Sequence, residues 1–431
     1  MRDPADLTAA QAVRAIADRK FTCEALAAAC IERIEAQELT LQAWAYFDRN
    51  AALAAARAAD KTSSRGLLHG VPFALKDIID TIDMPTAHGS PIYKGFRPGW
   101  DAPCVAACRD AGAVLFGKTV SAEFAHVQPG PTRNPHNPAH TPGGSSSGSA
   151  AVVGAGMVPA AFGTQTTGST IRPAAYCGTV GYKPSYGDFC LTGVRDNSPS
   201  LDTLGLIARS VEDLALFRSA VMVLPYEPLD TVSVSNLRIG FCRTPWWDQA
   251  EEYTRALLAS TAEALSKAGA HVSDFTMPDG AAGLVEAMRD VSGFEFARVI
   301  LHERLHHKDQ LSNKLLNGRV ADGIACTYEG YRSALATLED YRNRFTAAMA
   351  GFDLLLTPSA AGEAPEGIRS TGNPIFNLAW TATYTPAVTL PSGSGPLGLP
   401  LGIQLIGHRN DDYRFLSAAQ AVEDLLRDHN T

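Results

Sequence analysis

The sequence predicts an α/β protein: one large domain, residues 1–431, in which a β-sheet is covered by helices on both faces. Short apolar segments alternate with helical patterns along the chain, which is typical of layered α/β proteins. Hydrophobic residues make up 45% of the 431 residues, enough for a large buried core. Length alone would permit two or three domains, but we find no internal repeat and no polar linker between domains.

The N-terminal segment, about residues 1–62, is expected to be helical. Thr8 can cap a helix that runs through Asp18, and Thr22 can cap a second one through Ile34. The Ala-rich run 51–59 then predicts a third helix.

Strands and further helices are expected in the rest of the chain. The short apolar runs predict buried strands, at 71–76, 114–117, 237–241, 353–356, 387–390 and 403–406. Helical patterns cover 101–110, 250–268 and 411–427.

Residues 128–149 are rich in Pro, Gly, Asn and Ser. Composition alone favours a flexible linker here. However, the serines lead directly into the small apolar run 150–157, which is typical of a buried segment. The sequence therefore leaves open a linker and an ordered loop that enters the core.

The charge pattern excludes several classes of function. The formal net charge is −8 and no tract is rich in Lys or Arg, so we expect neither nucleic acid nor an anionic membrane as a partner. No apolar run reaches 18 residues, and residues 1–6 do not resemble a signal peptide. The eight cysteines are scattered. We therefore expect a cytoplasmic protein with reduced thiols, four disulfides in a secreted protein being the weaker alternative.

Ser169 lies in a segment whose pattern suits acyl transfer. Residues 158–172 read as a short apolar strand, a polar turn and a helix that opens near Ser169. Such a turn leaves main-chain N–H groups free to bind a developing oxyanion. The alternative is that Ser169 only caps a helix.

A serine needs a base to act as a nucleophile. No histidine lies near Ser169 in the sequence, although a base need not be local. Lys76 ends the apolar run 71–75, and burial there would lower its pKa towards neutrality. The alternative is a lysine at a strand end that reaches solvent.

Three ordered motifs resemble those of the amidase signature family. Residues 70–77 are similar to its lysine motif, residues 143–150 to its Gly/Ser-rich motif, and residues 163–178 to its nucleophile motif. Residues 201–213 and 402–407 add further matches, so the resemblance spans nearly the whole chain. It implies a mixed central sheet and a hydrolase that cleaves a carbon–nitrogen amide bond. It also implies a variable pocket or lid region at about 245–345.

The resemblance implies a role for each matching residue. Ser169 would be the nucleophile, and Ser145, after a cis peptide bond, would bridge it to Lys76. Ser146 would be a supporting hydroxyl that hydrogen-bonds the lysine. The main-chain N–H groups of residues 166–169 (Thr166, Thr167, Gly168 and Ser169) would form the oxyanion hole. Thr167 and Ser147 stand where many members have glycine, and Thr167 would narrow the pocket.

Within the family the closest likeness is to malonamidase-type amidases. It extends to Arg172, which would share a helix face with Ser169 and clamp a substrate carboxylate. The alternative is an arginine that only holds the turn. The substrate is expected to be a small-molecule amide or carbamate; carbamates (urethanase activity), aryl esters and anilides all stay open. A homodimer stays open as well.

Two other functions have some support in the sequence. His302, Glu303 and His306 match the zincin pattern His-Glu-x-x-His, but no third ligand is evident, so neither a metal nor another cofactor is expected. An amidotransferase subunit, which passes ammonia to an acyl group held by a partner chain, is the alternative of another class.

Overall fold

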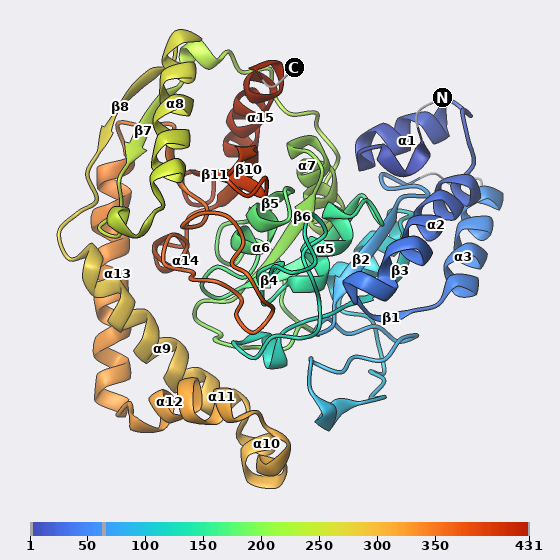
Figure 1. The fold of residues 1–431 in the computed structure, drawn as a ribbon, viewed down its shortest axis with the longest axis horizontal. Helices are drawn as coiled ribbons and strands as arrows, with labels where there is room; N and C mark the ends of the chain where they lie inside the picture. The colour runs from blue at the N-terminus through green and yellow to red at the C-terminus, as the bar shows by residue number, and fades with distance from the viewer. Residues whose placement is uncertain (1–2, 63–65, 430–431) are drawn as a thin grey trace.

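The computed structural model describes residues 3–62 and 66–429. The starting residues Met1 and Arg2 of the N-terminal segment lie outside this range. An 11-stranded sheet forms the centre, in the order β1-β3-β2-β4-β6-β5-β10-β11-β9-β7-β8. Both parallel and antiparallel neighbours occur, so the mixed sheet of the prediction is confirmed (Figure 1).

The strands are short, as expected for buried strands. They are β1 (Trp44–Phe47), β2 (Pro72–Lys76), β3 (Val114–Thr119), β4 (Ala160–Gln165), β5 (Val180–Lys183), β6 (Thr203–Ala208), β7 (Arg238–Cys242), β8 (His271–Phe275), β9 (Leu354–Pro358), β10 (Ala387–Ser394) and β11 (Pro400–Ile406).

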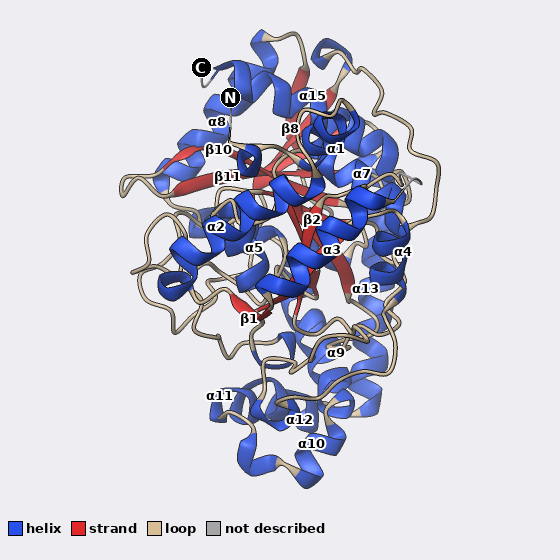
Figure 2. Cartoon of the chain, turned by 90° about the vertical axis from the view of Figure 1, so that its right-hand side faces the viewer, coloured by secondary structure: helices blue, strands red, loops and turns tan. Residues whose placement is uncertain are grey.

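Helices surround this sheet (Figure 2). They are α1 (Ala9–Ala17), α2 (Cys23–Leu41), α3 (Arg49–Lys61), α4 (Pro103–Asp110), α5 (Ser147–Gly154), α6 (Ile171–Tyr176), α7 (Val211–Val221), α8 (Glu252–Lys267), α9 (Leu284–Val299), α10 (Leu301–His306), α11 (Asn313–Leu315), α12 (Ala321–Ala325), α13 (Tyr328–Met349), α14 (Leu378–Ala382) and α15 (Asp412–His429).

The N-terminal helices follow the sequence signals closely. Thr8 caps α1 through a capping box with Gln11, and Thr22 caps α2. The third helix begins earlier than the Ala-rich run indicated, because Asp48 accepts hydrogen bonds from two main-chain N–H groups of its first turn. Strand β1, between α2 and α3, was not predicted.

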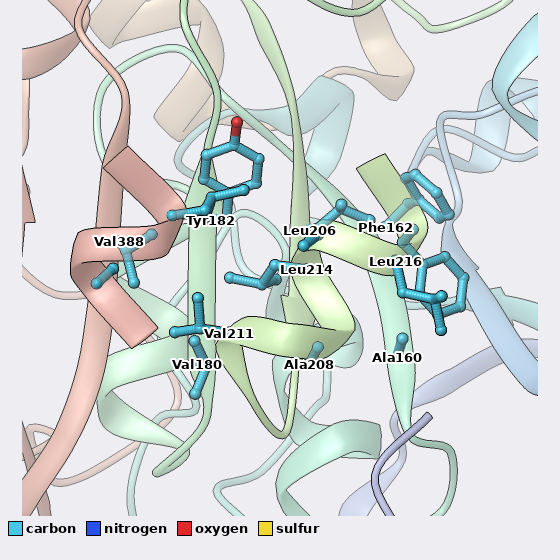
Figure 3. Packing of buried hydrophobic residues seen from close by; sticks show 14 of the residues in the cluster. Ala160, Phe162, Val180, Tyr182, Leu206, Ala208, Val211, Leu214, Leu216 and Val388 are labelled. Atoms are coloured by element: carbon cyan, nitrogen blue, oxygen red, sulfur yellow. The ribbon is translucent and has the colours of Figure 1, made fainter. Parts of the chain in front are cut away.

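The two faces of the sheet are packed separately. On one face Phe73 and Phe162 of the central strands join a cluster with α7 and α15; part of it is shown in Figure 3. On the other face Ala74 and Ala161 pack with α2 and α5. Since successive strand residues point to opposite faces, this alternation places helices on both sides of the sheet, as predicted.

Residues 128–149 are an ordered part of this structure. Residues 140–153 are buried throughout. The side chain of Asn134 is fully buried and donates to the main-chain oxygens of Thr141 and Tyr176. The linker suggested by composition is therefore wrong, because the polar groups of this loop are satisfied inside the protein.

The region 245–345 contains two kinds of structure. Strand β8 extends the central sheet, and helix α8 packs against β8 and β9. Helices α9 to α12, residues 284–325, form a helical lobe, which reaches away from the sheet in both views (Figures 1 and 2). Within residues 3–62 and 66–429, no helix is long and apolar enough to cross a membrane.

Candidate active site

Lys76 ends β2 and its side chain is fully buried. Its Nζ lies 2.7 Å from Ser145 Oγ and 2.8 Å from Thr164 Oγ1. Thr164 is within reach because β2 and β4 are parallel neighbours, with Leu75 opposite Phe162. Burial lowers the pKa of Lys76 from 10.5 to about 7, whereas the carboxyl group of Asp202 acts to raise it. A neutral amine is therefore accessible near neutral pH.

Ser145 lies in the loop that precedes α5. The Gly144–Ser145 peptide bond is cis, in agreement with the resemblance. The serine is 1% exposed, and its main-chain oxygen accepts a hydrogen bond from Ala122 N at 3.1 Å. The loop thus holds the Ser145 hydroxyl against the lysine.

Ser146 is placed differently from the expectation. Its hydroxyl accepts from Thr164 N at 3.2 Å and donates to Thr164 O at 3.3 Å. The hydroxyl that contacts Lys76 besides Ser145 is that of Thr164. A Cβ on Gly163 would lie 2.6 Å from Ser146 Oγ, so this close approach requires glycine. Ser146 therefore supports the lysine through Thr164 and not by direct contact.

Ser169 lies in the turn between β4 and α6. The Gln165 side-chain oxygen accepts from Thr170 N at 3.0 Å and Ile171 N at 3.1 Å, which fixes this turn. Ser146 N donates to Ser169 O at 3.3 Å and so ties the two serine segments together. The hydrogen bonds of the described residues join Lys76 to Ser145 but do not join the hydroxyls of Ser145 and Ser169.

Residues 166–169 line a pocket of about 110 Å³. Within the part of the chain that the structure describes, their four main-chain N–H groups have no hydrogen-bond partner in the protein. These N–H groups are therefore free to bind a negative oxygen beside Ser169.

Arg172 lines the same pocket and is 3% exposed. Its Nε donates to Thr371 O at 2.6 Å, and its Nη2 donates to Gly144 O at 2.5 Å. Its Nη1 is buried without a partner among the described residues. Arg172 thus holds the loop of Ser145 and keeps one further donor for another group.

A second arginine reaches this pocket from the helical lobe. Arg319 Nε donates to His126 Nε2 at 2.8 Å, and both residues line the pocket. Burial and the charge of Arg319 hold the pKa of His126 well below its usual value, so His126 accepts as a neutral ring. None of the described residues that line the pocket carries a carboxylate. Its two guanidinium groups therefore favour an anionic ligand.

The zincin pattern lies outside this pocket. Glu303 is 1% exposed and accepts from Tyr93 Oη at 2.5 Å and from Arg195 at 2.6 Å, so its carboxylate is engaged in an internal ion pair. No group of three or more His, Cys, Asp or Glu side chains among residues 3–62 and 66–429 is placed to hold a metal ion.

Sequence reasoning missed four residues of this site: Thr164, Gln165, Asp202 and Arg319. Asp202 belongs to one of the matching motifs, but nothing in the motif gave it a role. Arg319 lies in the variable region and carries no local signal, so only the folded structure places it beside Ser169.

Comparison with known protein families gives the class of this protein, an enzyme that acts on carbon–nitrogen bonds. A sequence model described as Amidase matches residues 25–416, and the chain belongs to this amidase family. Among curated relatives, a glutamyl-tRNA(Gln) amidotransferase subunit of Chloroflexus aurantiacus is 32% identical, with 98% of this chain and 97% of that protein covered.

Solved structures of amidases are also similar. One described as an amidase has a TM-score of 0.89 at 29% identity, covering 97% of this chain and 99% of that one. The peptide amidase PAM, in complex with chymostatin, has a TM-score of 0.85 at 30% identity, covering 98% of each chain. A 6-aminohexanoate cyclic dimer hydrolase has a TM-score of 0.85 at 25% identity, with 98% of both chains covered.

Proposed function

We propose that this protein hydrolyses the amide bond of a small molecule that carries a carboxylate, through an acyl-enzyme on Ser169. The observation that carries the proposal is the buried amine of Lys76, 2.7 Å from the Ser145 hydroxyl, beside a turn of free N–H groups. Lysine is rarely buried without an ionic partner unless it has a function.

In the proposed reaction one proton passes from Ser169 through Ser145 to Lys76 and then returns through Ser145 to the leaving amine. Neutral Lys76 takes the proton of Ser145, and Ser145 takes the proton of Ser169 after rotation of a serine hydroxyl. The 2.7 Å distance between Lys76 Nζ and Ser145 Oγ permits proton transfer in either direction. Ser169 Oγ attacks the carbonyl carbon, and the N–H groups of residues 166–169 bind the oxyanion. The C–N bond then breaks as the proton returns through Ser145 to the leaving amine. Water repeats these steps on the ester and releases the acid.

The pocket supports an acidic substrate. Arg172 and Arg319 bring two positive charges, and no carboxylate among the described lining residues neutralises them. A substrate carboxylate would accept from Arg172 Nη1, which has no partner within the described part of the protein. This role agrees with the likeness to malonamidase-type amidases.

A hydrolysis panel tests this proposal. The purified chain is given amides with and without a carboxylate, anilides, aryl carbamates and aryl esters. We expect the highest kcat/KM for the acidic amides, with Arg319→Leu raising KM for these alone. Arg289→Leu is the matched control, because this exposed arginine lies on the same lobe and contacts Arg319 through its main-chain oxygen. Absence of turnover on every substrate, together with no labelling of Ser169 by a fluorophosphonate, would contradict the proposal.

A second candidate is an amidotransferase subunit, which the similarity to subunits of glutamyl-tRNA(Gln) amidotransferases favours. A subunit of that kind would need partner chains. Steady hydrolysis by the isolated chain at a rate that added glutamine and acceptor do not change would favour the hydrolase. We place the hydrolase in the cytoplasm and expect no cofactor; its oligomeric state, a homodimer among the candidates, is open to measurement by sedimentation.

A further inference from the structure

Asp202 is a buried carboxylate beside the proposed proton relay. It lies one residue before β6, and Thr166 lies one residue after β4. These strands are antiparallel, with Gln165 opposite Thr203, so Asp202 and Thr166 face each other where the ladder ends.

The hydrogen bonds of Asp202 reach the loop of the oxyanion hole. Its Oδ1 accepts from Thr166 Oγ1 at 2.5 Å, and its Oδ2 accepts from the main-chain N–H groups of Asn197 and Ser198 at 2.7 and 2.8 Å. The residue is 6% exposed, and burial raises the pKa of its carboxyl group to about 7, although the hydrogen bonds from Thr166, Asn197 and Ser198 act to lower it. Among the described residues it forms no ion pair within contact distance.

The charge of Asp202 acts on Lys76, which is hydrogen-bonded to Thr164. A small cavity is lined by both Asp202 and Thr164, and the Thr164 hydroxyl is the one that contacts Lys76 Nζ at 2.8 Å. Asp202 is also the acidic group whose charge acts on the pKa of the lysine, raising it. The other charged groups around this cavity are Arg195 and Asp196.

We propose that Asp202 is a positioning residue with two effects: it fixes Thr166 of the oxyanion loop, and its carboxylate interacts electrostatically with Lys76 across the cavity beside Thr164. This inference rests on the proposed function of Lys76. Asp202 touches neither the substrate nor the reacting atoms, and it acts through Thr166 and Lys76.

The sign of the second effect follows from Coulomb attraction. A negative carboxylate favours the ammonium form of a lysine, so removing its charge lowers the pKa of that lysine. The neutral amine then persists to lower pH. In Asp202→Asn, the rate of Ser169 labelling should therefore fall off at a pH about one unit lower than in the wild type. A shift of about one unit is typical of a buried charge neighbour.

The test measures the rate of Ser169 labelling by a fluorophosphonate as a function of pH, which requires no knowledge of the natural substrate. Thr166→Val removes the hydrogen bond and keeps the carboxyl group. Because this hydrogen bond acts to lower the pKa of Asp202, we expect slower labelling and an acidic limb that moves less than in Asp202→Asn. Asp196→Asn is the matched control, because this exposed carboxylate lines the same cavity without contacting Thr166. The acidic limb of the labelling profile of Asp196→Asn is expected to stay in place.

A limb that stays in place or moves to higher pH in folded Asp202→Asn would overturn the inference. If that variant does not fold, Asp202→Ser decides, since it also removes the charge and keeps a small polar side chain: a limb moved to lower pH supports the inference, and an unmoved limb overturns it. Wild-type protein whose Ser169 is unlabelled at every pH would instead contradict the proposed function itself.

Discussion

Replacing Lys76 by methionine should abolish activity and at the same time change how stability depends on pH. Burial lowers the pKa of this lysine from 10.5 to about 7 in the folded protein. Between these values the unfolded chain binds a proton that the folded protein does not. The free energy of unfolding of the wild type should therefore rise with pH in this window, by about 1.4 kcal/mol per unit.

The methionine variant lacks this contribution. It also leaves the hydroxyls of Ser145 and Thr164 without their lysine partner, at a cost of about 1–3 kcal/mol each that does not depend on pH. The absolute difference in stability between variant and wild type thus combines opposing effects. The change of this difference with pH, in contrast, reports the titration of Lys76 alone. Relative to the wild type, the variant should lose about 2 kcal/mol between pH 7 and pH 9, because the slope reaches its full value only above the folded pKa.

Denaturant unfolding of both proteins at pH 7, 8 and 9 measures this slope. Lys183→Met is the matched control, because Lys183 is also fully buried, burial lowers its pKa to about 7, and it lies outside the site. That variant should show a similar slope and keep its activity. A Lys76→Met difference that is constant from pH 7 to pH 9 would mean that the lysine is charged when folded, and the proposed base would be refuted.

Ser169→Ala should abolish turnover and fluorophosphonate labelling while thermal unfolding stays within about 0.5 kcal/mol of the wild type, because the residue is only half-buried; residual turnover would point to another nucleophile. Arg172→Ala should raise KM for acidic amides and also lower stability by about 2–4 kcal/mol, since its guanidinium holds Thr371 O and Gly144 O; equal effects on neutral substrates would leave only the structural role. Gly168→Ala should cost most of the activity, because its Cβ would lie 2.4 Å from Asn377 Oδ1 and 2.9 Å from Arg172 Nη1; unchanged kinetics would contradict the proposed oxyanion turn. Prolonged treatment with a chelator should leave the rate unchanged, and a complete loss that added metal restores would count against the serine relay.

Much of the fold could be predicted because its signals are local. The capping residues Thr8 and Thr22 and the apolar runs of β2, β3 and β9 lie where the sequence indicated. Strands β5, β6 and β8 were not predicted. Strand β8 is an edge strand with mostly exposed residues, so it lacks the continuous apolar run of a central strand.

The site divides in the same way. Lys76, Ser145 and Ser169 could be predicted because each belongs to one of the three ordered motifs. Thr164 and Asp202 depend on which strands are neighbours and in which register, and these are properties of tertiary structure that a single sequence does not display. The pairing of β2 with β4 brings Thr164 to the lysine, and the pairing of β4 with β6 brings Asp202 to Thr166.

The helical lobe also has an evolutionary consequence. The central sheet and its loops supply the groups that we propose react, whereas Ser292 and Arg319, from residues 284–325, line the same pocket from the helical lobe. Glu303 secures the lobe to Tyr93 and Arg195, far along the chain from the nucleophile. Replacing residues 284–325 as one segment should change the substrate range and leave Lys76, Ser145 and Ser169 in place. Directed evolution of a new substrate range should therefore begin in this segment.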